Sequence, residues 1–171
     1  QQHSSKSKTY IANVLKKIVI DVSVRDKYLD GVTFVDTPGY NNAVGQDESD
    51  KKTADDAMEK CDAIFWCIDV ESGTITKNDL EMLKKVQDKP IVILYTKMDK
   101  KDVGAVRKII QNTEKLCAKE FNKDKFPLAI LSFSCVTRQL YATSNTTFSQ
   151  IIQALKTKSG SPMSLLTRYS G

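Results

Sequence analysis

The chain has 171 residues, enough for one domain with a sizeable hydrophobic core. Its composition, 40% hydrophobic and 27% charged, is ordinary for a soluble globular protein. The 26 basic and 21 acidic residues are scattered and give a net charge of only +5. We therefore expect no nucleic-acid partner, whereas a weak attraction to an anionic membrane surface stays open.

Neither a membrane span nor a secretory leader is indicated. No apolar run approaches the roughly 20 residues that a span requires, and no signal-peptide pattern opens the sequence. The four cysteines form no CxxC pair and lie in apolar or helical patterns, which predicts reduced core thiols: Cys61, Cys67, Cys117 and Cys135. We expect a cytoplasmic protein, with peripheral membrane association left open. Because the sequence begins at Gln1 and not at methionine, we also expect a processed end or a fragment.

The first part of the chain predicts an antiparallel hairpin. Residues 1–16 are a polar lead-in, and residues 17–24 alternate apolar and polar positions as a strand does. Asp30-Gly31 then turns the chain into a second, apolar strand that ends at Asp36.

After a polar loop over residues 41–52, helices and strands alternate. The spacing of apolar residues predicts, in order, a helix over 54–61, a strand over 63–70, a helix from the capping box at 76–79, a strand over 90–95, a helix over 106–117, a strand over 127–134 and a helix from the capping box at 147–150. The strand over 90–95 is continuously apolar, as buried parallel strands are.

This alternation predicts the fold class and the domain limits. Right-handed crossovers give an α/β fold with a mostly parallel sheet, to which the first hairpin supplies one antiparallel strand. The expected divisions are a lead-in at 1–16, a domain at 17–157 and a linker or C-terminal tail at 158–171. A ligand would bind at the edge where the strands end. The strand ends at this edge are Asp36, Asp69, Thr96 and Ser134.

The turn after the second strand has phosphate-site chemistry. Asp36 follows an apolar run that fits a buried strand, Pro38 fixes φ, and Gly39 allows close approach of the backbone to a ligand. A carboxylate facing hydrated Mg²⁺ and a glycine amide facing a terminal phosphate would use this arrangement. An ordinary strand followed by an Asx-type turn explains these positions equally well.

The second constellation is Thr96-Lys97-Met98-Asp99, directly after a strand. A carboxylate only accepts hydrogen bonds, so Asp99 can pair with the two adjacent donors of guanine, whereas adenine offers no such pair. The Lys97 stem can lie along the base plane, and the Thr96 hydroxyl can tie loops together. The alternative is a Lys-Asp turn in which Asp99 caps a helix.

Three such segments occur in a fixed order, each behind an apolar strand. They are the Asp-x-x-Gly turn, the Thr-Lys-x-Asp turn and Phe133-Ser134-Cys135. On these motifs, and on the similar segments 28–39, 61–69 and 74–83, the chain resembles the guanine-nucleotide-binding domain of P-loop GTPases. It most closely resembles the dynamin superfamily, including bacterial members, over roughly residues 17–157.

The resemblance implies a three-layer P-loop GTPase-like fold and a set of roles. Asp36, Thr37 and Gly39 would form the catalytic segment, with Asp36 holding Mg²⁺ through water, Gly39 sensing the γ-phosphate and residues 40–50 acting as a switch loop. The residues that would bind the base of GTP or GDP are Thr96, Lys97, Asp99, Ser134 and Cys135. Cys135 replaces an alanine of the family pattern, a tolerable change if only the backbone amide is used.

One family motif is missing from the sequence. No Gly-x-x-x-x-Gly-Lys-Ser/Thr occurs in the 171 residues, so we expect a domain truncated before its phosphate loop and lacking its first strand. The parent protein is expected to hydrolyse GTP, in a membrane-remodelling role, and this chain to be inactive alone. The exposed sheet edge or apolar gap left by the absent strand would favour self-association. Two alternatives stay open, a ribosome- or RNA-associated bacterial GTPase and a non-catalytic pseudo-GTPase scaffold.

Overall fold

The computed structural model describes residues 27, 29–37, 48–122, 127–142, 148–159 and 163–170. The described strands form one sheet of order β1-β6-β2-β3-β4-β5. Their bounds are β1 Val32–Asp36, β2 Ala63–Asp69, β3 Ile91–Thr96, β4 Ala129–Phe133, β5 Leu140–Ala142 and β6 Met163–Ser170. The helices are α2 Glu48–Lys60, α3 Lys77–Lys85, α4 Val103–Glu120 and α5 Phe148–Ser159, with short 3₁₀ turns η1 Val70–Ser72 and η2 Met98–Lys100.

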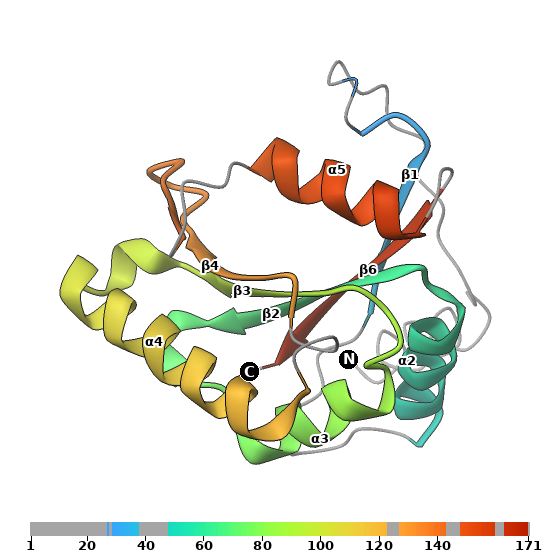
Figure 1. Ribbon diagram of the computed structural model, residues 1–171, viewed down its shortest axis with the longest axis horizontal. Helices are drawn as coiled ribbons and strands as arrows, with labels where there is room; N and C mark the ends of the chain where they lie inside the picture. The colour runs from blue at the N-terminus through green and yellow to red at the C-terminus, as the bar shows by residue number, and fades with distance from the viewer. Residues whose placement is uncertain are drawn as a thin grey trace, which may run out of the picture.

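Helices cover the sheet on both faces and make a three-layer α/β fold (Figure 1). Side chains of a strand alternate between the faces, and β2 shows this directly. Ile64, Trp66 and Ile68 pack in the cluster that includes α2, α3 and α4, while Phe65 and Cys67 pack in the cluster with α5. The predicted three-layer fold with a mostly parallel sheet is therefore confirmed.

The predicted elements between residues 54 and 134 appear, but α2 begins at Glu48, inside the stretch predicted to be a polar loop. The ends of the other elements shift by a few residues. The capping box of α3 is present, because the Thr76 side chain accepts a hydrogen bond from Asp79 N and the Asp79 side chain accepts one from Thr76 N. In α5, the three predicted inward residues are buried: Ile151, Ile152 and Leu155. Thr147 of the second predicted capping box lies outside the described residues.

The antiparallel pair in the described residues is not the predicted hairpin, which stays a prediction. Residues 17–24, the expected hairpin partner of β1, lie outside the described residues. In the described part of the chain, the antiparallel pair is β4 with β5, whereas β1 pairs in parallel with β6. The strand β5, which has only three residues, was not predicted from the sequence.

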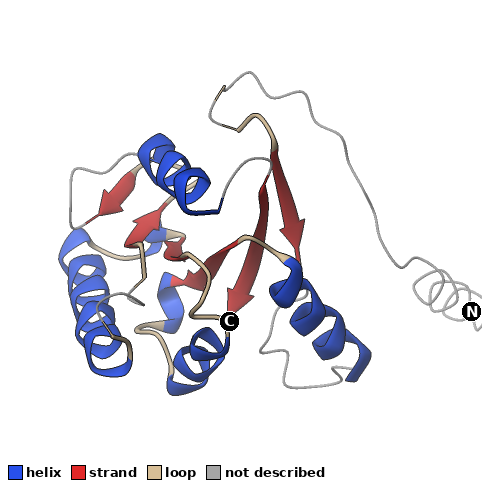
Figure 2. Ribbon diagram, turned by 45° about the vertical axis from the view of Figure 1, so that its right-hand side comes forward, coloured by secondary structure: helices blue, strands red, loops and turns tan. Residues whose placement is uncertain are grey.

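The strand β6 is the largest difference from the sequence analysis, which assigned residues 158–171 to a linker or tail. It lies between β1 and β2 and pairs in parallel with both (Figures 1 and 2). A strand therefore occupies the interior position between β1 and β2, and the expected self-association stays a prediction.

Two burial predictions are also wrong. The apolar run of β1 was expected to be buried, yet Phe34 is 50% exposed because β1 is the outermost strand of the described sheet. Cys135 was expected in the core, but it is exposed in the turn after β4, while Cys61, Cys67 and Cys117 are buried as predicted.

Candidate functional site

The parallel strands bring their carboxyl ends to one edge of the sheet. Asp69 and Thr96 are the last residues of β2 and β3 and are register partners. Asp36 ends β1 beside Thr167 of β6, and Ser134 follows β4 directly. The four strand ends expected to form a ligand edge are thus together at that edge, which is where α/β sheets bind ligands.

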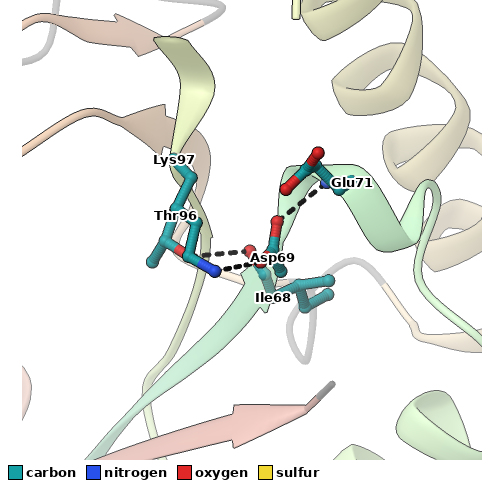
Figure 3. Close-up of polar contacts among 5 residues, drawn as sticks. All are labelled: Ile68, Asp69, Glu71, Thr96 and Lys97. Carbon is teal, nitrogen blue, oxygen red and sulfur yellow. Dashed lines mark hydrogen bonds and ion pairs between the residues drawn. The ribbon is translucent and has the colours of Figure 1, made fainter. Parts of the chain in front are cut away.

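Thr96 and Lys97 join the end of β3 to the end of β2 (Figure 3). The Thr96 Oγ1 donates a hydrogen bond to Ile68 O at 3.4 Å. Lys97 has φ 59° and ψ 36°, a left-handed conformation that is uncommon for a residue with a side chain. The chain turns sharply there and enters η2, so the Lys97 side chain leaves β3 toward β2.

The Lys97 ammonium forms an ion pair with the Asp69 carboxylate. Asp69 was predicted to lie at the ligand edge of the sheet, but no role was predicted for it. Lys97 Nζ lies 2.5 Å from Asp69 Oδ2, and Asp69 Oδ1 accepts a hydrogen bond from Glu71 N at 2.9 Å (Figure 3). The hydrogen bond with Lys97 is the main cause that lowers the pKa of Asp69, and the same bond raises the pKa of Lys97. The signal that could have identified Asp69 was its place at the end of the strand next to the one that carries Thr96-Lys97.

Asp99 and Ser134 come from two loops and meet at this edge. The Ser134 Oγ lies 2.5 Å from Asp99 Oδ1 and also accepts the backbone N–H groups of Val136 and Thr137 at 3.2 and 3.1 Å. Because those two amides can only donate, the one hydroxyl proton of Ser134 is donated to the Asp99 carboxylate. This bond lowers the pKa of Asp99.

The arrangement gives Asp99 a defined orientation at the surface. Ser134 is fully buried, whereas Asp99 is exposed. A buried serine therefore holds an ionised carboxylate whose other oxygen can accept hydrogen bonds from a ligand. Four predicted base-binding residues are brought to one end of the sheet: Thr96, Lys97, Asp99 and Ser134. Cys135 follows them in the exposed turn.

The predicted phosphate segment lies at the other side of β6. Asp36 is exposed at the end of β1, Thr37 is buried, and Gly39 lies outside the described residues. Burial raises the pKa of the Cys67 thiol on β2 to about 12, and the negative charge of Asp36 contributes to this rise. Cys67 is consequently a neutral core thiol at physiological pH.

Asp36 is chemically suited to be the carboxylate ligand that a protein commonly supplies to Mg²⁺. In the described part of the chain there is no cluster of three potential metal-ligating side chains. Mg²⁺ usually keeps several waters and takes one or two carboxylates plus substrate phosphates, so a single exposed carboxylate at the sheet edge suits it. Asp36 would be that carboxylate, and water and phosphate would have to supply the remaining ligands.

The comparisons with known proteins give one match. A family model described as the dynamin family matches residues 1–98, which include the Asp36 turn and Thr96-Lys97. No curated protein matches the chain, and no solved structure does. Among the helices that the structure describes, none is long and apolar enough to cross a membrane.

Proposed function

Because the chain belongs to the dynamin family, a family of GTPases that bind guanine nucleotides, we propose that the sheet edge with Asp99 and Ser134 binds the guanine base. The observation that carries the proposal is the oriented Asp99 carboxylate. An ionised carboxylate accepts from the ring N–H and the exocyclic amine of guanine together. Adenine has an acceptor at the ring position and would leave the carboxylate unpaired.

The phosphates would extend from the base toward Asp36. Asp36 would hold Mg²⁺ through water, and the ion would neutralise negative charge on the phosphates. In the parent protein, water would attack the γ-phosphate, and the backbone around Gly39 would respond to the presence of that phosphate. The role in membrane remodelling and a cytoplasmic, peripheral membrane location belong to this proposal for the parent, and co-sedimentation with anionic liposomes tests them.

Weak binding is expected from the 171 residues by themselves. The sequence contains no Gly-x-x-x-x-Gly-Lys-Ser/Thr motif, so the backbone cradle and lysine that usually hold the β-phosphate are not supplied by it. Base contacts remain, and they select guanine without supplying most of the affinity. The chain should therefore not hydrolyse GTP alone.

Titration with GDP and ADP, followed by amide chemical shifts, tests the proposal. We expect saturable GDP binding weaker than micromolar, with shifts confined to residues near Asp99 and Ser134, and no comparable response to ADP. Asp99→Asn should remove the preference for GDP, whereas Asp88→Asn, an exposed aspartate after α3, should not. Equal responses to both nucleotides, or none at millimolar GDP, would contradict base recognition. Micromolar or tighter binding would show that the absent loop is not needed.

A further inference from the structure

The contact between Lys97 and Asp69 is built from two separate strand ends. Lys97 follows β3 and Asp69 ends β2, so the lysine side chain spans the sheet edge between these neighbouring strands (Figure 3). The left-handed backbone at Lys97 directs the side chain along this path, and it is one of two non-glycine residues with positive φ in the described chain. Such a conformation persists only where surrounding contacts maintain it.

The Asp69 carboxylate is itself held in one orientation. Its Oδ1 accepts the Glu71 amide and caps η1, which leaves Oδ2 directed at Lys97. The Thr96 hydroxyl bond to Ile68 O keeps the two strand ends together beside it. The Asp69 side chain is 24% exposed and that of Lys97 is 58% exposed, so the carboxylate is the sheltered anchor and the lysine is the exposed partner.

We propose that Asp69 is a positioning residue for guanine-nucleotide binding, which fixes the Lys97 side chain so that its aliphatic stem presents a flat, apolar surface to the base. The inference rests on the proposed function. A lysine in solvent samples many rotamers and would lose that freedom when a base packs against it. Because the ammonium is already held by Asp69, the side chain loses this conformational entropy when the protein folds and not when the nucleotide binds. Nucleotide binding is correspondingly tighter.

Asp69 and Asp99 then have different tasks at the same edge. Asp99 would distinguish guanine from other bases because it contacts the base edge. Asp69 would not contact the base, so it would change affinity without changing which base is preferred. This separation gives each residue its own experimental signature.

Asp69→Asn is the informative variant. An asparagine oxygen can still accept the Glu71 amide, so the cap of η1 is kept while the charge partner of Lys97 is removed. Exposed ion pairs contribute modestly, and we expect GDP affinity to fall by about two- to fivefold. The loss should shrink at high salt, where the pair in the wild type is screened. Asp69→Glu, which restores the charge, should recover part of the affinity.

The matched control removes another ion pair of similar exposure. Lys84 and Glu120 join α3 to α4 on the surface, and Glu120→Gln should leave GDP affinity unchanged. The ratio of GDP to inosine diphosphate affinity should be unchanged in Asp69→Asn and altered in Asp99→Asn, because inosine lacks the exocyclic amine. Thermal unfolding of each variant checks that the fold is kept.

The experiment separates the two proposals. If the wild type binds GDP over ADP and Asp69→Asn binds GDP equally well, the positioning role is wrong and base recognition stands. If Asp69→Asn changes the ratio of GDP to inosine diphosphate affinity, Asp69 acts on the base edge, and the inference is again wrong. If the wild type binds neither GDP nor ADP, the proposed function fails, and the inference fails with it.

Discussion

The Ser134 hydroxyl oxygen makes three hydrogen bonds, so this position of the candidate site should be especially sensitive to substitution. It donates to Asp99 and accepts from Val136 and Thr137, so the loop after β4 and the Asp99 carboxylate depend on it together. The sequence predicted Ser134 as a base-binding residue. It could not show that the contact is with Asp99, because the two residues come from different loops.

Ser134→Ala should lower the free energy of unfolding by about 1–3 kcal/mol, since two amides and a carboxylate lose their partner. Ser132→Ala, in the strand that precedes Ser134, is a matched control, because Ser132 is equally buried but its hydroxyl contacts only the Met98 sulfur among the hydrogen bonds found for it. Urea denaturation of both variants measures the difference. A loss no larger for Ser134→Ala than for Ser132→Ala would contradict the bridging role.

The ion pair at the sheet edge has a defined pH range. The pKa of Asp69 is lowered in the folded chain, so its contribution is present above the unfolded value of about 3.9 and is lost as the pH falls through the folded value. The pKa of Lys97 is raised, so its contribution is present below about 10.4 and is lost as the pH rises through the folded value. The stability difference between wild type and Asp69→Asn should be constant from about pH 5 to 9 and smaller outside that range. Urea denaturation across pH measures it, and a difference that keeps growing with acid would contradict the assignment.

The helix α3 shows how far local sequence determines an element. The pattern from Thr76 to Asp79 predicted its start, and the structure contains the reciprocal hydrogen bonds. The same helix is also held from outside, because the Tyr95 hydroxyl accepts the Ile75 amide at 2.9 Å and lies 2.6 Å from Thr113 Oγ1. This buried network joins the residue before Thr96 to α3 and α4. No local pattern indicates it, because its members are far apart in the sequence.

Thr76→Ala should therefore destabilise the chain by about 1 kcal/mol, the usual cost of losing such a cap. Asn78→Ala, an exposed change in the first turn of α3, is the control and should have little effect. Thermal unfolding of the two variants gives the comparison. Equal unfolding temperatures would mean that the Tyr95 network alone fixes the start of α3.

The arrangement of the sheet was predictable only where strands are largely apolar. β2, β3 and β4 are such strands and were identified, because burial on both faces selects apolar residues at most positions. Met163–Ser170 mixes apolar, polar and basic residues after a Ser-Gly-Ser-Pro segment, so its local pattern indicates a tail. Its place in the sheet depends on pairing with strands from the other end of the chain, which periodicity does not reveal.

Thr167→Pro tests whether β6 is part of the folded core. Thr167 pairs with Asp36 on one side and with Phe65 on the other, so proline there removes a backbone donor in the interior of the sheet. We expect the free energy of unfolding to fall by at least about 2 kcal/mol, whereas Thr167→Val should be tolerated. Urea denaturation measures both. A stable Thr167→Pro variant would show that β6 is dispensable.

The position of β6 also determines when the sheet can be fully assembled during synthesis. During synthesis β6 emerges after every other described element, yet its place is between β1 and β2. Until then, β1 has no strand partner among the described residues, and the edge of β2 that β6 covers is open. A nascent chain that has not yet made β6 thus carries open strand edges that are prone to wrong pairing. The pairing of β6 with β1 and β2 joins segments that lie far apart in the sequence, and such non-local contacts slow folding.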